Sequence, residues 1–277
     1  MIKNVALFFL FHLILFSKNT VSIDTVFFYP TSFSIDEAKT ESLNRCRKIA
    51  VEKTVPKKTI IAGNAILEKM ESDGEYHENA AFTSFHSSTS LGYITKETVE
   101  LALPESFVEN GFNYHISYKA TVEVPKGERD SGLKINFYPK SRSVNDGEEL
   151  VLFLNPSMNG FLYIFHFMPD QSVELMFPNQ YLFDNALEKK SVFQFPSDDQ
   201  IKIRLKALPH RKITTETFYA VFCKKEIPEL NKIIQLNEHK GRTSAGDGSF
   251  EKFQSILAEI PLSQRIEAAL QVLVLSK

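Results

Sequence analysis

The feature that most constrains the fold is a series of short extended runs in the second half of the chain, divided by turn signals. Asn145-Asp146-Gly147, Asn159-Gly160 and Pro169-Asp170-Gln171 carry residue types that favour tight turns. The runs that alternate with these turns or follow them are rich in Phe, Leu, Ile and Val, and they span residues 133–138, 149–154, 161–167, 173–177, 191–195, 201–205 and 217–223. Strands at such regular spacing predict a mostly-β domain, sandwich-like or barrel-like.

The first half shows a different pattern, in which one amphipathic helix precedes further extended runs. Ser34 and Glu37 have the spacing of a capping box, apolar residues recur mostly on one face after them, and Pro56 ends the pattern. A helix is therefore expected over residues 35–54. The extended runs that follow it are 59–67, 81–85, 93–103 and Tyr114–Val124, the last of which alternates throughout. Because neither element buries its apolar side alone, we predict an α+β domain with one helix on an antiparallel sheet.

The N-terminus has the three-part layout of a secretory signal peptide. A short basic start precedes an apolar run from Val5 to Phe16 that only His12 interrupts, and a polar stretch with small residues follows. The run is shorter than the roughly 20 residues that span a bilayer, so cleavage near Ser22–Ile23 is favoured over an uncleaved anchor, a buried strand or no export. No Cys directly follows the run, the first being Cys46. We therefore expect an exported, unlipidated protein, periplasmic or at the cell surface, with no transmembrane helix in the mature chain.

The remaining segments complete the predicted domain organisation. Residues 125–132 are polar and rich in helix- and strand-breaking residues, which makes them the best linker candidate. The C-terminal segment reads as helical at 226–236, 250–260 and 262–269, with a loop at 241–248 and a candidate final strand at 270–275. The predicted domains are a signal peptide at 1–22, an α+β domain at 23–125, a linker at 126–131, a β-sandwich-like domain at 132–228 and a helical C-terminal extension at 229–277.

Charge and cysteine content narrow the range of functions. The formal net charge of −2 gives no basic face of the kind that nucleic-acid binding normally needs, so no nucleic-acid partner is expected. The two cysteines, Cys46 and Cys223, fall in a predicted helix of the first half and a predicted strand of the second. An oxidising compartment would permit a disulfide between them, but two buried, unpaired thiols are the favoured interpretation.

The motifs that usually mark an enzyme or a metal site are missing from the sequence. No G-x-S-x-G is present, and no pair of histidines has the i, i+4 spacing of a helical zinc site with an adjacent Glu. A group around His77 and His86 is interpreted as a solvated loop rather than a metal site. His115 and His166, inside strands, are expected to be packed or hydrogen-bonded. We therefore predict no catalytic, metal or cofactor-binding residues, and no cofactor.

Two features are left as candidate contact surfaces. Asn179, Asp184 and Asn185 form a polar cluster after a predicted strand, where they would either hold a ligand or partner peptide or close the turn by bonding backbone groups. The second reading is favoured. The alternating aromatic residues at 161–167 are likewise expected to form a core face rather than a groove for a partner strand.

The ordered motifs of the second half resemble domain of unknown function family 4384. The residues that carry the resemblance are Asn159-Gly160-Phe161-Leu162-Tyr163-Ile164-Phe165, Met176-Phe177-Pro178-Asn179, Phe183-Asp184-Asn185, Phe195-Pro196 and Tyr219-Ala220-Val221-Phe222. One departure is Gln171, where the family has a glycine. The resemblance covers about residues 132–228 and implies a β-rich accessory domain, because the family has no established activity.

The first half more weakly resembles the N-terminal domain of flagellar assembly protein T and related bacterial envelope lipoproteins. The matching positions are Ala38, Arg45, Arg47, Ala50, Gly92-Tyr93-Ile94 and Tyr114–Val124. Together with the export signal, these resemblances predict a bacterial envelope protein that acts as a non-catalytic binding or assembly module with an envelope protein as partner. An unrecognised envelope hydrolase is the alternative.

Overall fold

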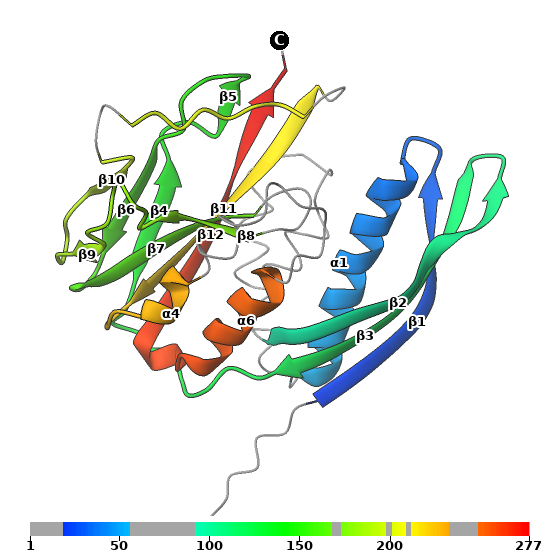
Figure 1. The fold of residues 1–277 in the computed structure, drawn as a ribbon, viewed down its shortest axis with the longest axis horizontal. Helices are drawn as coiled ribbons and strands as arrows, with labels where there is room; N and C mark the ends of the chain where they lie inside the picture. The colour runs from blue at the N-terminus through cyan, green and yellow to red at the C-terminus, as the bar shows by residue number, and fades with distance from the viewer. Residues whose placement is uncertain are drawn as a thin grey trace, which may run out of the picture.

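The computed structural model describes residues 19–55, 92–167, 173–197, 201–208, 212–232 and 249–276. It has one N-terminal helix on an antiparallel sheet, then a sheet-rich part with short C-terminal helices (Figure 1). This is the predicted fold class. The predicted runs at 59–67 and 81–85, the turn at 169–171 and the loop at 241–248 lie outside the described residues.

The N-terminal sheet has the order β1-β3-β2 and is antiparallel throughout. Its strands are β1 (Asn19–Pro30), β2 (Tyr93–Val108) and β3 (Gly111–Glu123). The even-numbered residues of β3 from Phe112 to Val122 are buried on one face, so the alternation predicted for Tyr114–Val124 is confirmed. Residues 19–22, which cleavage near Ser22–Ile23 would remove, pair with β3. The cleavage site stays a prediction.

Helix α1 (Ile35–Thr54) covers the buried face of this sheet. Its capping box is present, because Ser34 Oγ accepts from the backbone N–H of Glu37 (3.2 Å) and Glu37 Oε2 accepts from that of Ser34 (2.7 Å). Ala38, Cys46, Ala50 and Val51 are fully buried, so one stripe of the helix faces the strands. The expected helix at 35–54 is confirmed.

The C-terminal part consists of two sheets that share one apolar core. One sheet has the order β10-β6-β4, and the other runs β5-β12-β11-β7-β8, with β9 paired to β7. The strands are β4 (Ile135–Pro139), β5 (Ser143–Asn145), β6 (Leu152–Pro156), β7 (Gly160–Phe167), β8 (Val173–Phe177), β9 (Ala186–Leu187), β10 (Phe193–Phe195), β11 (Ile213–Cys223) and β12 (Arg265–Leu275). Residues 201–205 contribute only an isolated bridge between Arg204 and Glu149.

The C-terminal segment corrects one prediction. Helix α6 (Ser249–Glu259) is present as expected, and α4 (Pro228–Asn231) is a short helix inside the run predicted at 226–236. The helix predicted at 262–269 is wrong, because only a 3-10 turn, η2 (Leu262–Gln264), precedes a strand that starts at Arg265. That strand pairs with β11 over eleven residues, so pairing within a sheet outweighs the helical pattern of its first residues.

A shared core joins the two halves. Tyr163, Phe165 and Phe167 of β7 are buried on the sheet face that packs on α6, and the Phe165 ring lies 4.6 Å from that of Phe253. These residues belong to the same core cluster as Cys46 of α1. The aromatic run at 161–167 is thus a core face, as expected. The boundaries proposed for the domains stay predictions.

Candidate functional site

A buried ion pair links α1 to β2 beside α6. Arg47 Nε donates to Glu97 Oε2 (2.9 Å), and the Tyr118 hydroxyl donates to the same oxygen (2.8 Å). The Arg47 guanidinium also lies over the Phe250 ring of α6, 4.3 Å from its centroid. Burial alone would raise the pKa of Glu97, but the Arg47 charge and its hydrogen bonds hold that pKa below the usual range.

A second buried network links the start of β2 to β11 and β12. Arg265 Nε donates to Glu267 Oε1 (2.6 Å), the Tyr93 hydroxyl donates to the same oxygen (2.9 Å), and the Tyr219 hydroxyl donates to the other carboxylate oxygen. The side chains of Arg265 and Glu267 are 0% and 5% exposed. Burial opposes ionisation of Glu267, but Arg265 and the two hydroxyls hold its pKa below the usual range. Both networks lie at the junction of the two halves, where their charged groups bind one another.

The polar cluster predicted after β8 closes a loop. Asn179 Nδ2 donates to the Met176 carbonyl (2.7 Å), while its Oδ1 accepts from the backbone N–H groups of Tyr181 and Leu182 (both 2.9 Å). Asp184 Oδ1 accepts from the N–H of Ala186 (3.2 Å). The favoured interpretation of these two side chains as turn-closing groups is therefore what the geometry shows.

Asn185 is the third member of the predicted edge, and it is turned inward. Asn185 is only 6% exposed, and its backbone carbonyl accepts a hydrogen bond from the N–H of Leu162 in β7 (2.9 Å). Asn185 thereby anchors the far end of the loop to the sheet. The idea that this edge holds a ligand or partner through its polar side chains stays a prediction.

Two aromatic side chains stand out from this loop into solvent. Tyr181 is 71% exposed and Phe183 is 79% exposed, while Leu182 between them packs against the core of the sandwich. Exposed aromatic residues on a fixed loop are what a protein contact surface needs, since Tyr and Phe are enriched at interfaces and lose little side-chain freedom there. We call Pro178–Asn185 the aromatic loop. The sequence pattern predicted the polar residues that close this loop but not the exposure of Tyr181 and Phe183. The signal that could have identified them is their position: both are aromatic residues inside a turn, outside any alternating run.

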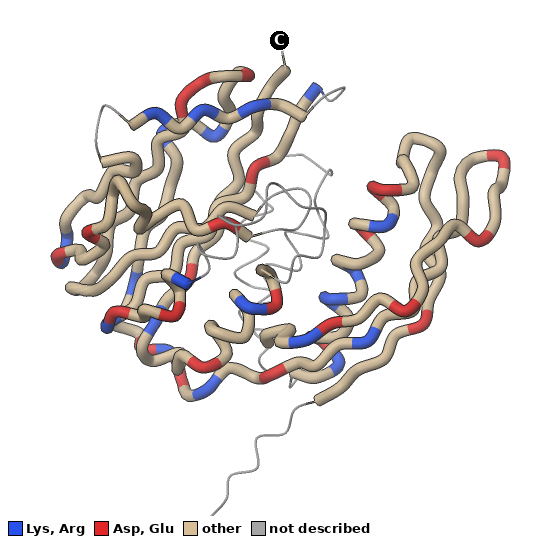
Figure 2. The backbone as a smooth tube through the Cα atoms, in the orientation of Figure 1, with Lys and Arg blue, Asp and Glu red and all other residues tan. Residues whose placement is uncertain are grey.

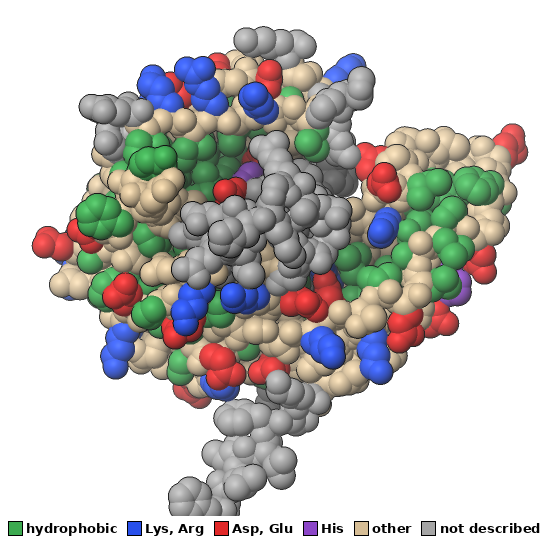
Figure 3. Space-filling model, viewed as in Figure 1, with side chains coloured by type: hydrophobic (Ala, Val, Ile, Leu, Met, Phe, Trp, Pro, Cys, Tyr) green, Lys and Arg blue, Asp and Glu red, His purple; other side chains and the backbone are tan. Residues whose placement is uncertain are grey.

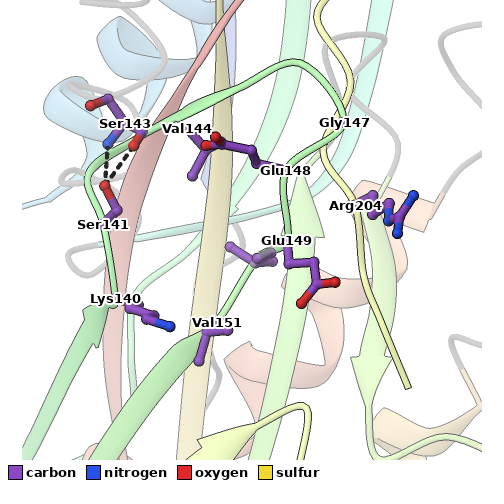
Figure 4. A pocket seen from close by; sticks show the side chains of 10 residues that line it. Lys140, Ser141, Ser143, Val144, Gly147, Glu148, Glu149, Val151 and Arg204 are labelled. Atoms are coloured by element: carbon purple, nitrogen blue, oxygen red, sulfur yellow. Dashed lines mark hydrogen bonds between the residues drawn. The ribbon is translucent and has the colours of Figure 1, made fainter. Parts of the chain in front are cut away.

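A shallow groove of about 620 Å³, lined by both polar and apolar residues, opens at the end of the sandwich that holds β5. Lys140, Glu149 and Arg204 reach it from three separate segments (Figure 4). Figure 2 shows Lys and Arg residues along 201–208, the segment that carries Arg204. Glu149 pairs with Lys202 (2.7 Å), and that hydrogen bond lowers the pKa of Glu149. A carboxylate held ionised in this way does not donate a proton near neutral pH, and no His or Cys is among the lining residues.

The remaining candidate reactive groups are occupied or buried. Cys46 and Cys223 are unpaired and buried, as expected, and burial raises the pKa of each thiol to about 12. His115 Nε2 lies 2.6 Å from Asp24 Oδ1, and His166 Nε2 lies 2.5 Å from a Glu216 oxygen, so both strand histidines are hydrogen-bonded as predicted.

The described residues contain neither a cluster of metal-binding side chains nor a helix suited to a membrane span. Within those residues, no three His, Cys, Asp or Glu side chains gather closely enough to bind a metal ion. None of the described helices has the length and apolarity that a membrane span requires.

A comparison with protein families finds one match inside the C-terminal half. The model of the family described as Domain of unknown function (DUF4384) matches residues 143–225, which run from β5 through β11 and include the aromatic loop. The predicted resemblance of the second half is thus confirmed over those residues. A search of curated proteins finds none that matches the chain. The resemblance of the first half to flagellar assembly protein T lies outside the matched residues and stays a prediction.

Proposed function

We propose that the chain is an exported bacterial envelope protein that acts as a non-catalytic binding or assembly module. The observation that carries the proposal is the aromatic loop, in which Tyr181 and Phe183 are 71% and 79% exposed. Large apolar rings left in water on a rigid loop favour a partner that buries them. The proposed partner is another envelope protein.

The loop geometry favours binding by a preformed surface. Asn179 makes three side-chain hydrogen bonds to the backbone, and Asn185 ties the loop to β7. A loop already fixed in its bound form loses less conformational entropy when a partner arrives. Truncating Tyr181 or Phe183 should therefore weaken partner binding more than truncating other residues of the loop.

The non-catalytic part of the proposal rests on the chemistry of the candidate groups. The buried thiols have raised pKa values, the strand histidines are paired with carboxylates, and the groove carboxylate Glu149 is held by Lys202. None of these groups combines an activated nucleophile with a free base, which is the arrangement that hydrolysis by a side chain needs.

A capture experiment with paired variants tests the binding role. The purified protein would be immobilised and exposed to an envelope extract, with the double variant Tyr181→Ala/Phe183→Ala and the control Phe107→Ala run beside it. Phe107 is also 71% exposed but lies on the hairpin of β2 and β3, where Figure 3 shows another apolar surface. A partner kept by wild type and control and lost from the double variant is expected. Equal capture by all three proteins would refute the role of the loop.

Export is tested separately. The protein would be expressed in a bacterium with its own N-terminus, the periplasmic and medium fractions collected, and the first residue of the recovered chain sequenced. We expect a chain that begins near Ile23. A chain found only in the cytoplasm with an intact Met1 would contradict export.

A further inference from the structure

Among the described strands, β1 pairs with β3 alone. Its pairs with β3 run without a register shift from Asn19 with Val122 to Pro30 with Gly111. No strand among the described residues pairs with its other edge, which lies on the outside of the N-terminal half (Figure 1). The backbone N–H and C=O groups of such an edge form a template for another strand.

The opposite edge of the same sheet, formed by β2, is protected against pairing with another strand, whereas the β1 edge is not. Strand β2 has three register shifts against β3, contains Pro104, packs against α6, and carries four charged residues: Lys96, Glu97, Glu100 and Glu105. Register shifts, charges, proline and a covering helix are the usual means of preventing edge pairing. Strand β1 has no register shift, no Lys or Arg, and a single charge at Asp24, and its only proline is its last residue.

The side chains beside the open edge are suited to pairing. Val26 and Phe28, on the sheet face away from α1, are 44% and 52% exposed. Thr25 and Phe27 point to the opposite face, toward α1, and are partly buried. β-Branched and aromatic residues make the most favourable cross-strand pairs.

We propose that β1 pairs antiparallel with β1 of a second copy, about a two-fold axis through Val26, so that two three-stranded sheets join into one. Val26 then lies opposite Val26 of the second copy, and Thr25 lies opposite Phe27 on the α1 face. The overlap extends over Ser22–Pro30 and therefore survives the proposed cleavage of the signal peptide. A symmetric dimer of this kind closes on itself and does not extend into a fibre.

The single charge on the strand favours this register over the one with its axis at Asp24. With the axis at Asp24, two carboxylates would lie directly opposite each other, which destabilises a strand pair. With the axis at Val26, Asp24 lies opposite Phe28 and four residues along the strand from its symmetry mate. Asp24 also has a partner within its own sheet, since its Oδ1 lies 2.6 Å from His115 Nε2. The register with its axis at Val26 therefore avoids repulsion between the two Asp24 carboxylates.

Cysteine substitution tests the register directly. Val26→Cys would place two thiols across the axis, whereas Leu103→Cys is the matched control on β2, because Leu103 is 42% exposed and pairs with the same His115. The native thiols, Cys46 and Cys223, are buried and should not interfere. Mild oxidation should give a covalent dimer of the first variant and not of the second. Equal cross-linking of both variants, or of neither, would overturn the proposal.

Sedimentation of the uncross-linked protein gives the second readout. The wild-type protein should be a dimer. Val26→Lys should raise the dissociation constant of the dimer at least about tenfold, because two ammonium groups would face each other. Leu103→Lys should leave the dissociation constant unchanged. A monomeric wild type, or a dimer that Val26→Lys leaves intact, would overturn the proposal. The aromatic loop is not part of this interface, so Val26→Lys should keep the envelope partner and the two proposals fail independently.

Discussion

Replacing Arg265 with Met should leave the carboxylate of Glu267 buried without its cation. The two side chains are 0% and 5% exposed, so neither charge is solvated in the native fold. Breaking a buried pair from one side costs about 3–5 kcal/mol. Typical domains are stable by only about 5–15 kcal/mol, so Arg265→Met should remove a large share of the free energy of unfolding.

The matched double variant separates this cause from simple loss of packing. In Arg265→Met/Glu267→Gln no charge is buried, and the Gln oxygen can still accept from Tyr93 or Tyr219. Among the described residues, Arg265 Nη1 is buried without a hydrogen-bond partner, so the native network is itself imperfect. The double variant should therefore regain at least about 2 kcal/mol relative to Arg265→Met.

Urea unfolding followed by far-UV circular dichroism measures these differences, since the chain has no Trp for fluorescence. Lys202→Met is the control, because its partner Glu149 lies at the surface and the pair should contribute almost nothing. Additive losses, with the double variant less stable than Arg265→Met, would refute the argument from an unpaired buried charge.

Three further results are expected. Asn179→Ala should destabilise the fold by about 1–2 kcal/mol in urea unfolding, since it removes three hydrogen bonds, and should weaken partner capture. Stability should be level from neutral pH to about 5 and should fall below about pH 4, because Glu97 and Glu267 have folded pKa values below their ordinary value of about 4.3; urea titrations across this range check it. Cys46 and Cys223 should resist a maleimide in the native state and react after unfolding, because burial raises both pKa values to about 12.

Each of these three results has a clear opposite. An Asn179→Ala protein as stable as wild type would mean that the loop is not fixed by its amide. The sign of the pH effect follows from depressed carboxyl pKa values, whose contribution is present above the unfolded pKa and is lost as pH falls through the folded one. Equal stability at about pH 3 and pH 7 would contradict it. Rapid labelling of either native thiol would show that it is reachable.

Local sequence signals predicted the elements whose causes are local. Ser34 and Glu37 defined the start of α1, and alternation at Tyr114–Val124 identified β3, because capping and one-sided burial act within a few residues. The strand at Arg265–Leu275 was partly misread. Its first residues contain Glu, Ala and Gln, which favour helices, and only pairing with β11 makes them extended.

In the candidate site, too, the sequence predicts what has a local cause and not what depends on contacts distant in the chain. The tendency of Asn179 and Asp184 to bond nearby backbone groups is visible in the sequence. The exposure of Tyr181 and Phe183 is not, because a large apolar residue in a turn can equally fold back onto the core, as Leu182 does. The junction of the two halves through Arg47 and Arg265 also depends on contacts between residues far apart in the chain.

Photo-cross-linking at the aromatic loop tests the central claim most directly. A photoreactive phenylalanine analogue placed at position 183 should capture an envelope protein in living cells, while the same analogue in place of Phe107 should not. Both positions are largely exposed, at 79% and 71%, so their reach into solvent is similar. A specific adduct should form from position 183 alone. No adduct from position 183, or the same adducts from both positions, would contradict a binding role for the loop.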